Sequence, residues 1–156
     1  MKIDDFDRQI MEMLQNNARM TIKEISSNLG LSSTPVFERI KRLEKNGYID
    51  KYVALLNRDL LGYKMVAFVQ ISLSLHNLHE VNSFVERITV FPEVMECYHT
   101  TGDSDFLLKI LVKDMDQFNE FILNKLSNIE NLGRVKTQFA LSTRKRTTAL
   151  DLEVDL

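Results

Sequence analysis

Residues 30–49, GLSSTPVFERIKRLEKNGYI, place a glycine, three hydroxyl side chains and a proline directly before evenly spaced apolar and basic residues. The apolar residues recur at the spacing of a buried helix stripe: Val36, Ile40 and Leu43. Pro35 suits the first turn of such a helix, where its missing N–H would have no partner. We expect Ser33 or Thr34 to cap the helix and Gly47 to end it.

Two further helices are predicted upstream. The run TIKE at residues 21–24 is a capping box, in which Thr21 accepts from the N–H of Glu24 and the Glu24 carboxylate reaches back. That helix should end at Gly30, which readily adopts a left-handed backbone. An earlier helix should start at Asp4 or Asp5. The expected inward residues of the two helices are Phe6, Ile10 and Leu14, and then Ile22, Ile25 and Leu29.

Two short helices joined by a turn of about three residues are typical of a helix-turn-helix that reads DNA. The run YIDKYVALL, residues 48–56, is predicted as a strand that leaves the third helix like a wing. A packed bundle is the alternative, with Glu38 and Arg42 making a solvated ion pair. On the DNA reading, the contacts come from Ser32, Ser33, Thr34, Pro35, Phe37, Glu38, Arg39, Lys41 and Arg42.

Beyond Gly62 the apolar period changes from that of helices to the two-residue period of strands. Strands are predicted at residues 64–75, 93–101, 106–113 and 135–142, with helices around residues 81–88 and 118–129, the latter capped by Asp114 or Asp116. The order βαββαβ predicts a ferredoxin-like α+β fold. Its helix-covered face should carry Met65, Ala67, Val69, Ile71 and Leu73. The opposite face, with Val66, Phe68 and Tyr98, would need a second copy to cover it.

Composition is that of a folded protein, with 44% hydrophobic and 27% charged residues. No apolar run reaches membrane-span length and the start is acidic, so a cytoplasmic location is predicted. The net charge is −2, yet residues 1–62 hold 10 Lys and Arg against 9 Asp and Glu, whereas residues 63–156 hold 10 against 13. A single cysteine and three scattered histidines predict no disulfide, metal site or cofactor.

The run from residue 3 to residue 49 resembles the N-terminal domain of the Lrp/AsnC (leucine-responsive, feast/famine) transcription regulators in its Asp-x-x-Asp start, NNAR, LGLS, TPVFERIKRLE and GYI. The second half, with TTGDSDFLL at residues 100–108, resembles that family's sensing domain. The resemblance implies a winged helix-turn-helix domain plus an ACT-like (RAM) domain, double-stranded DNA as partner, assembly as a dimer and an octamer made of a ring of four dimers, and an amino-acid effector such as leucine or another small apolar one. Ser26, Ser104 and the long tail RKRTTALDLEVDL depart from the pattern.

By this resemblance the effector contacts Thr101, Gly102, Asp103, Ser104 and Asp105. From the residues alone, GDSD is first a hairpin turn. A catalytic pair or metal site there lacks a nearby His, Cys or third carboxylate, so no catalytic residue is predicted. Cys97 is interpreted as a core residue and His99 as a structural histidine. The basic run at residues 144–146 is typical of a solvated chain end.

The expected organisation is a helix-turn-helix DNA-binding domain at residues 1–56, a linker at 57–62, a ligand-sensing and oligomerisation domain at 63–142 and a C-terminal tail at 143–156. The predicted function is a non-enzymatic, DNA-binding transcription regulator whose operator affinity or assembly responds to an amino acid. Two alternatives remain open. One is an ACT-like metabolite-binding protein that regulates a partner enzyme, and the other is a constitutive architectural DNA-binding protein.

Overall fold

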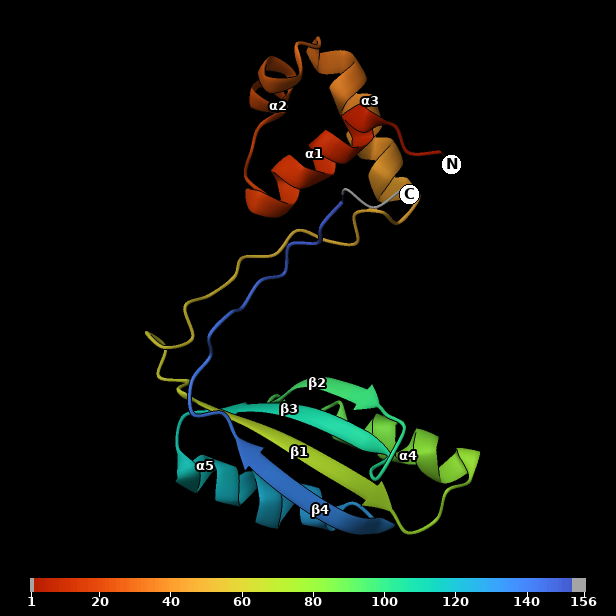
Figure 1. Cartoon of the computed structure of the whole chain (residues 1–156), viewed down its shortest axis with the longest axis vertical. Helices are drawn as coiled ribbons and strands as arrows, with labels where there is room; N and C mark the ends of the chain where they lie inside the picture. The colour runs from red at the N-terminus through yellow and green to blue at the C-terminus, as the bar shows by residue number, and fades with distance from the viewer. Residues whose placement is uncertain (1, 153–156) are drawn as a thin grey trace. The chain divides into compact units, whose positions relative to one another are not determined.

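The computed structural model describes residues 2–152, and in it the chain forms two compact units (Figure 1). Residues 2–55 and residues 145–152 make up the first, which we call the helical unit. Residues 56–144 make up the second, the sheet unit. The C-terminal residues therefore pack with the N-terminal helices and not with the sheet that precedes them. None of the helices among the described residues is long and apolar enough to cross a membrane.

The helical unit contains α1 (Asp5–Asn16), α2 (Ile22–Leu29) and α3 (Ser33–Lys45). Asp4 caps α1, and Thr21 with Glu24 forms the predicted capping box of α2. Gly30 ends α2 with φ of 66°, a left-handed conformation that costs a glycine little. The three helices share one core of buried residues: Ile3, Ile10, Met11, Leu14, Ile25, Val36, Ile40 and Leu43.

Three details of this unit differ from the sequence predictions. Helix α3 begins at Ser33, so Ser32 occupies the cap position, and its side chain makes no capping hydrogen bond. Phe6 is 37% exposed, because the buried stripe of α1 is formed by residues 7, 10, 11 and 14. Residues 50–56 form no strand, since none of the described residues offers them a hydrogen-bonded neighbour and a strand exists only in a ladder.

The sheet unit is an antiparallel four-stranded sheet in the order β2-β3-β1-β4, formed by β1 (Met65–Leu73), β2 (Val94–His99), β3 (Phe106–Val112) and β4 (Leu132–Phe139). Helices α4 (Leu78–Ile88) and α5 (Met115–Glu120) cover one face (Figure 1). This is the predicted ferredoxin-like arrangement, and Ala67, Val69 and Ile71 are fully buried on the predicted face. Strand β4 begins three residues earlier than predicted.

The second helical segment is less regular than predicted. Asp114 caps α5, which continues as a π turn over Phe121–Lys125 and a 3-10 turn over Leu126–Asn128. Phe121 and Leu126 are both buried in the core although they are five residues apart. A π turn places residues of that separation on one face, which an α-helix does not.

Ser26 offers a test of packing in the helical unit. Its side chain is 5% exposed, and its hydroxyl oxygen has no hydrogen-bond partner among the described residues. Because a buried unpaired hydroxyl costs free energy and alanine is the better helix former, we expect Ser26→Ala to raise the free energy of unfolding by about 1 kcal/mol. Urea denaturation of the two proteins measures the difference. A variant less stable than the parent would mean that the hydroxyl has a partner in solution.

Candidate functional site: a helix-turn-helix surface and an acidic loop

Helix α3 presents two different sides. Val36, Ile40 and Leu43 are buried against α1 and α2. Most of the predicted DNA contacts lie on the exposed side and extend from the residue before the helix to its middle: Ser32, Ser33, Thr34, Pro35, Phe37, Glu38 and Lys41. The structure therefore gathers these side chains on one continuous surface of the helical unit. With no side-chain cap at Ser32, the first N–H groups of α3 remain available to an acceptor such as phosphate.

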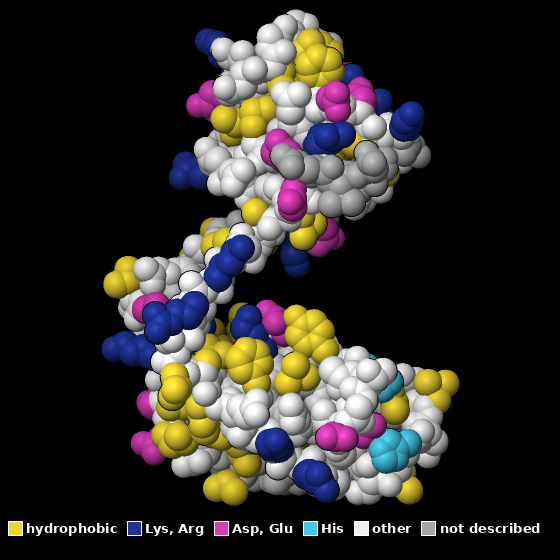
Figure 2. All heavy atoms as spheres, viewed as in Figure 1, with side chains coloured by type: hydrophobic (Ala, Val, Ile, Leu, Met, Phe, Trp, Pro, Cys, Tyr) yellow, Lys and Arg dark blue, Asp and Glu magenta, His cyan; other side chains and the backbone are white. Residues whose placement is uncertain are grey.

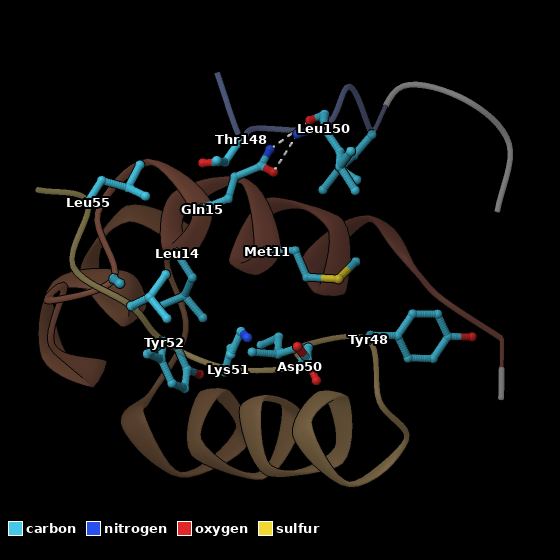
Figure 3. Close-up of a pocket in the computed structure, with 14 residues that line it drawn as sticks. Met11, Leu14, Gln15, Tyr48, Asp50, Lys51, Tyr52, Leu55, Thr148 and Leu150 are labelled. Atoms are coloured by element: carbon cyan, nitrogen blue, oxygen red, sulfur yellow. Dashed lines mark hydrogen bonds between the residues drawn. The ribbon is translucent and has the colours of Figure 1, made fainter. Parts of the chain in front are cut away.

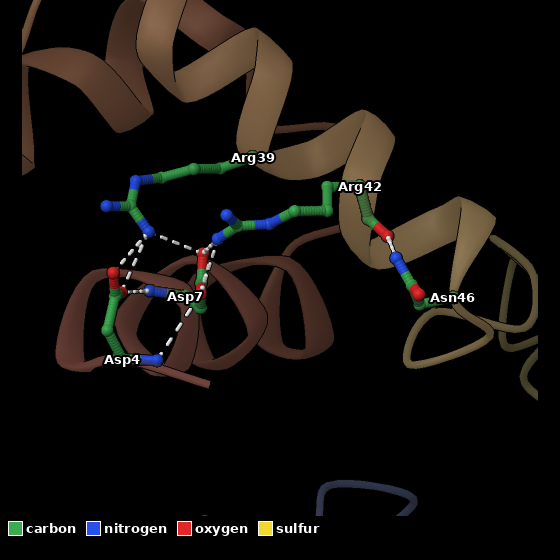
Figure 4. Close-up of polar contacts among 5 residues, drawn as sticks. All are labelled: Asp4, Asp7, Arg39, Arg42 and Asn46. Atoms are coloured by element: carbon green, nitrogen blue, oxygen red, sulfur yellow. Dashed lines mark hydrogen bonds and ion pairs between the residues drawn. The ribbon is translucent and has the colours of Figure 1, made fainter. Parts of the chain in front are cut away.

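Arg39 and Arg42 point instead toward α1 (Figure 4). One guanidinium nitrogen of Arg39 lies 2.7 Å from Asp7 Oδ1 and 2.7 Å from Asp4 Oδ2, and Arg42 Nη2 lies 2.8 Å from Asp7 Oδ2. The Asp7 side chain is completely buried, whereas those of Arg39 and Arg42 are 23% and 45% exposed. Both arginines therefore act in fixing α3 to α1, a role that the sequence analysis did not assign to them.

Asp4 and Asp7 also pair with each other at the start of α1. The N–H of Asp4 donates to Asp7 Oδ2 at 3.3 Å, and the N–H of Asp7 donates to Asp4 Oδ1 at 2.9 Å. Partial burial raises the pKa of Asp4, but the Asp7 N–H and the Arg39 guanidinium lower it more, so the pKa lies below its ordinary value. Asp4 in its ionised form thus favours the folded state at neutral pH, and this contribution is lost as the pH falls through that lowered pKa.

The side chain of Asn46 belongs to the end of the same helix. Its amide nitrogen donates to the carbonyl oxygen of Arg42 at 2.7 Å, a carbonyl that also accepts from the backbone N–H of Asn46 at 3.0 Å (Figure 4). The carbonyl of Leu43 accepts from the N–H of Tyr48 at 3.0 Å. Helix α3 is therefore fixed at its end by local hydrogen bonds and along its length by the pairing with Asp7.

The acidic loop at residues 101–105 joins β2 to β3 in the sheet unit. Gly102 has φ of 106°, so the tight turn favours glycine there. Thr101, Gly102 and Asp103 are exposed, and Ser104 and Asp105 are half-buried. The predicted effector residues thus form one stretch of the surface, in which the first three are exposed and the last two are partly covered.

Asp105 is already engaged within the sheet unit. Its Oδ2 accepts from the N–H of Leu73 at 2.7 Å and lies 3.1 Å from Nε2 of His76, a residue that the sequence analysis did not single out. Histidine and acidic side chains lie beside each other on this unit in Figure 2. The loop is also held by Ser72 Oγ, which donates to the carbonyl of Asp103 at 3.1 Å. Asp105 therefore orders the loop, while the Asp103 carboxylate faces solvent.

The remaining candidates behave as packing residues. Cys97 packs against the core of the sheet unit, and burial raises the pKa of its thiol. His99 stacks on the ring of Phe106 with 5.0 Å between the ring centroids. Residues 2–152 contain no group of three or more His, Cys, Asp and Glu side chains that could hold a metal ion.

The Asp7 cluster yields a stability prediction. Asp7→Ala leaves the Arg42 guanidinium without its acceptor and Arg39 with Asp4 alone, and it removes a fully buried side chain, so we expect the free energy of unfolding to fall by about 2–3 kcal/mol. Arg42→Ala should cost less, because Arg39 still pairs with Asp7. Asp5→Ala, in the same turn but with a side chain 82% exposed, is the matched control. Denaturation that gave equal effects for the Asp5 and Asp7 variants would contradict the structural role of the cluster.

Comparison with known proteins identifies both halves of the chain. Residues 3–50 match the family model described as winged helix-turn-helix DNA-binding, and residues 66–150 match the Lrp/AsnC ligand binding domain. The chain is 36% identical over 151 residues to the HTH-type transcriptional regulator FL11 of Pyrococcus furiosus, covering 97% of both chains. It is 33% identical over 153 residues to the leucine-responsive regulatory protein of Rhizobium meliloti, covering 98% of this chain and 97% of the other.

Solved structures of related regulators match this chain over nearly its whole length. An AsnC family transcriptional regulator from Agrobacterium tumefaciens has a TM-score of 0.94 at 34% identity, covering 99% of this chain and all of the other. A transcriptional regulator of Neisseria meningitidis, in complex with L-Met, has a TM-score of 0.92 at 32% identity, covering 97% of this chain and 98% of that one. With both its domains matched in the order found here, the chain belongs to the Lrp/AsnC family of DNA-binding transcription regulators.

Proposed function

We propose that this regulator reads double-stranded DNA with the exposed side of α3 and binds an amino acid at the loop of residues 101–105. The observation that carries the DNA part is the division of α3 into a buried side and a free side. The free side carries exposed hydroxyl groups before and in the first turn and, further along, Lys41, whose side chain stays 60% exposed beside Glu44. Hydroxyl groups, helix N–H groups and a lysine are the donors that contact phosphates and base edges in a major groove.

The two arginines contribute to DNA binding in different ways in this proposal. Arg42, with 45% of its side chain exposed, can add a phosphate contact at the rim while one of its nitrogens stays on Asp7. Arg39, with 23% exposed, acts mainly through the orientation of α3. Loss of DNA binding in an Arg39 variant would therefore reflect a displaced helix as much as a lost contact.

Lys41 gives the cleanest test of the DNA surface. Its side chain is 60% exposed, and its ammonium lies 3.5 Å from Glu44 Oε2 and 5.8 Å from the centroid of the Phe37 ring. We expect Lys41→Ala to weaken binding to a duplex from the region upstream of the protein's own gene, and to reduce the slope of log affinity against log salt by about one. Fluorescence anisotropy across a salt series measures both, with Lys64→Ala in the sheet unit as control. Wild-type affinity and slope in the Lys41 variant would exclude α3 as the reading helix.

The effector part of the proposal is supported by the chemistry of the loop and by the L-Met complex of the Neisseria meningitidis relative. An amino acid brings an ammonium and a carboxylate, which need an acceptor and N–H donors. Asp103 offers an exposed carboxylate beside the exposed backbone of Thr101 and Gly102. Asp105, whose Oδ2 is held by Leu73 and His76, supports the loop rather than the ligand. A small apolar amino acid such as methionine or leucine is the proposed class.

Assembly is part of this proposal because the loop alone offers few groups to enclose a small ligand. The sheet face opposite α4 and α5 carries apolar side chains that the chain itself leaves partly open, Phe68, Leu107, Leu111 and Tyr98, whereas Val66, which the sequence analysis placed among the uncovered residues, is already buried at 5% exposure. A second copy packed on this face would bury them. We propose a dimer as the basic unit and a ring of four dimers as the larger assembly, with the effector site completed between chains.

Asp103 provides the test of the effector site. We expect Asp103→Asn, which keeps the shape but removes the charge, to weaken the binding of L-methionine or L-leucine at least tenfold and to leave DNA binding without ligand unchanged. Asp116→Asn, an exposed acid at the start of α5, is the control. Calorimetry with each standard amino acid measures binding, and sedimentation measures the assembly that the ligand favours. No heat and no change in assembly for any of them would favour a constitutive architectural DNA-binding protein.

A further inference from the structure

The helical unit contains a groove built from both ends of the chain (Figure 3). Its volume is about 350 Å³. One wall is α1, with Met11, Leu14 and Gln15, another is the segment of residues 48–55 that follows α3, and the third is the tail, residues 145–152. The tail is separated from α1 by more than 120 residues of sequence, so its position against α1 must depend on tertiary contacts.

Gln15 is the residue that holds the tail. Its amide nitrogen donates to the carbonyl of Leu150 at 2.8 Å, and its amide oxygen accepts from the N–H of Leu150 at 2.9 Å (Figure 3). The side-chain amide thus pairs with both the N–H and the carbonyl of one residue, Leu150, as a residue on a neighbouring antiparallel strand would. Such a pairing depends on an amide at position 15 but on no particular side chain at position 150, provided that the residue there has a backbone N–H.

Apolar contact adds to this pairing. Leu152 is half-buried and packs against the core of the helical unit, and Ala149 is half-buried as well. Leu150 itself is 71% exposed, so its contribution is through its backbone. The tail therefore has a hydrogen-bonded anchor at Leu150 and an apolar anchor at Leu152.

The segment across the groove is fixed to a different helix. The hydroxyl of Tyr52 donates to Glu44 Oε1 on α3 at 3.0 Å. Burial and the Glu44 carboxylate raise the pKa of Tyr52 to about 12, so the hydroxyl remains a donor at neutral pH. Residues 48–55 lead into the sheet unit at residue 56, and the tail comes from the end of β4. The helical unit is thus joined to the sheet unit by two chain segments, one fixed on α3 and the other on α1.

A domain connected by two chain segments has less orientational freedom than a domain connected by one. Ordering the helical unit on DNA therefore costs less conformational entropy when both segments are fixed to it. We propose that Gln15 is a positioning residue for DNA binding: by fastening the tail to α1, it makes the chain after β4 a second connection that limits how the reading helix can move. This inference rests on the DNA-binding function of the family and adds a residue that touches neither DNA nor effector.

The experiment compares the 156-residue protein with three variants of it on the same upstream duplex. Gln15→Ala keeps a good helix former at a surface position, and a chain that ends at Arg144 removes the tail altogether. Gln9→Ala, an exposed glutamine on the same helix, is the control. Hydrogen exchange reports whether the tail is fastened, and anisotropy titrations give both the affinity for DNA and the fraction of active protein. Sedimentation checks that the assembly is the same in all variants.

We expect the Leu150 amide to exchange at least tenfold faster in Gln15→Ala, and DNA affinity to fall about three- to tenfold in this variant and in the shortened chain. The active fraction and salt slope should stay at wild-type values, because positioning alters neither folding nor phosphate contacts. An unprotected Leu150 amide in the wild type, or wild-type affinity in the Gln15 variant with a released tail, would overturn the inference. Wild-type protein that binds no DNA while Leu150 remains protected would overturn the proposed DNA reading instead.

Discussion

The buried carboxylate of Asp7 is the constraint on which the helical unit depends. An ionised carboxylate that is fully buried is costly unless charged donors compensate it, and here two guanidinium groups from α3 do so. Arg39 and Arg42 lie three residues apart, so both reach Asp7 only when one side of α3 faces α1. The pairing therefore fixes the rotation of α3 about its own axis, and with it the residues that remain free on the other side.

In the sheet unit, hydrogen bonds to β1 order the loop between β2 and β3. The loop between β2 and β3 must be ordered without being covered if it is to meet a ligand. Asp105 and Ser72 bind the loop to β1, while Gly102 and Asp103 stay on the surface. One carboxylate thus orders the backbone and the other remains available. In each unit, a charged residue that the sequence analysis assigned to binding is engaged within the fold: Arg39 pairs with Asp7, and Asp105 accepts from Leu73. A charged residue two positions away, Lys41 or Asp103, is the exposed one.

Much of this protein could be predicted from local sequence. The caps at Asp4 and Thr21, the left-handed Gly30, the buried stripe of α3 and the alternation of β1 are confirmed, because each depends on residues within one turn or one strand. Asp7 also left a signal in the sequence that was missed. It occupies a core-facing position between Ile3 and Ile10, and a charge at such a position requires a partner from elsewhere in the fold.

The sequence by itself determined most of the helices, the order of helices and strands along the chain and the resemblance to the Lrp/AsnC regulators, since periodicity and capping are short-range properties. Only the tertiary structure decided which charges are free, because a side chain's partner is set by what the fold brings near it. Arg39 and Arg42 meet acids more than 30 residues away, and Gln15 meets Leu150 at a separation of 135 residues. No local pattern encodes such pairings, since they arise where packed elements place one group within hydrogen-bonding distance of another.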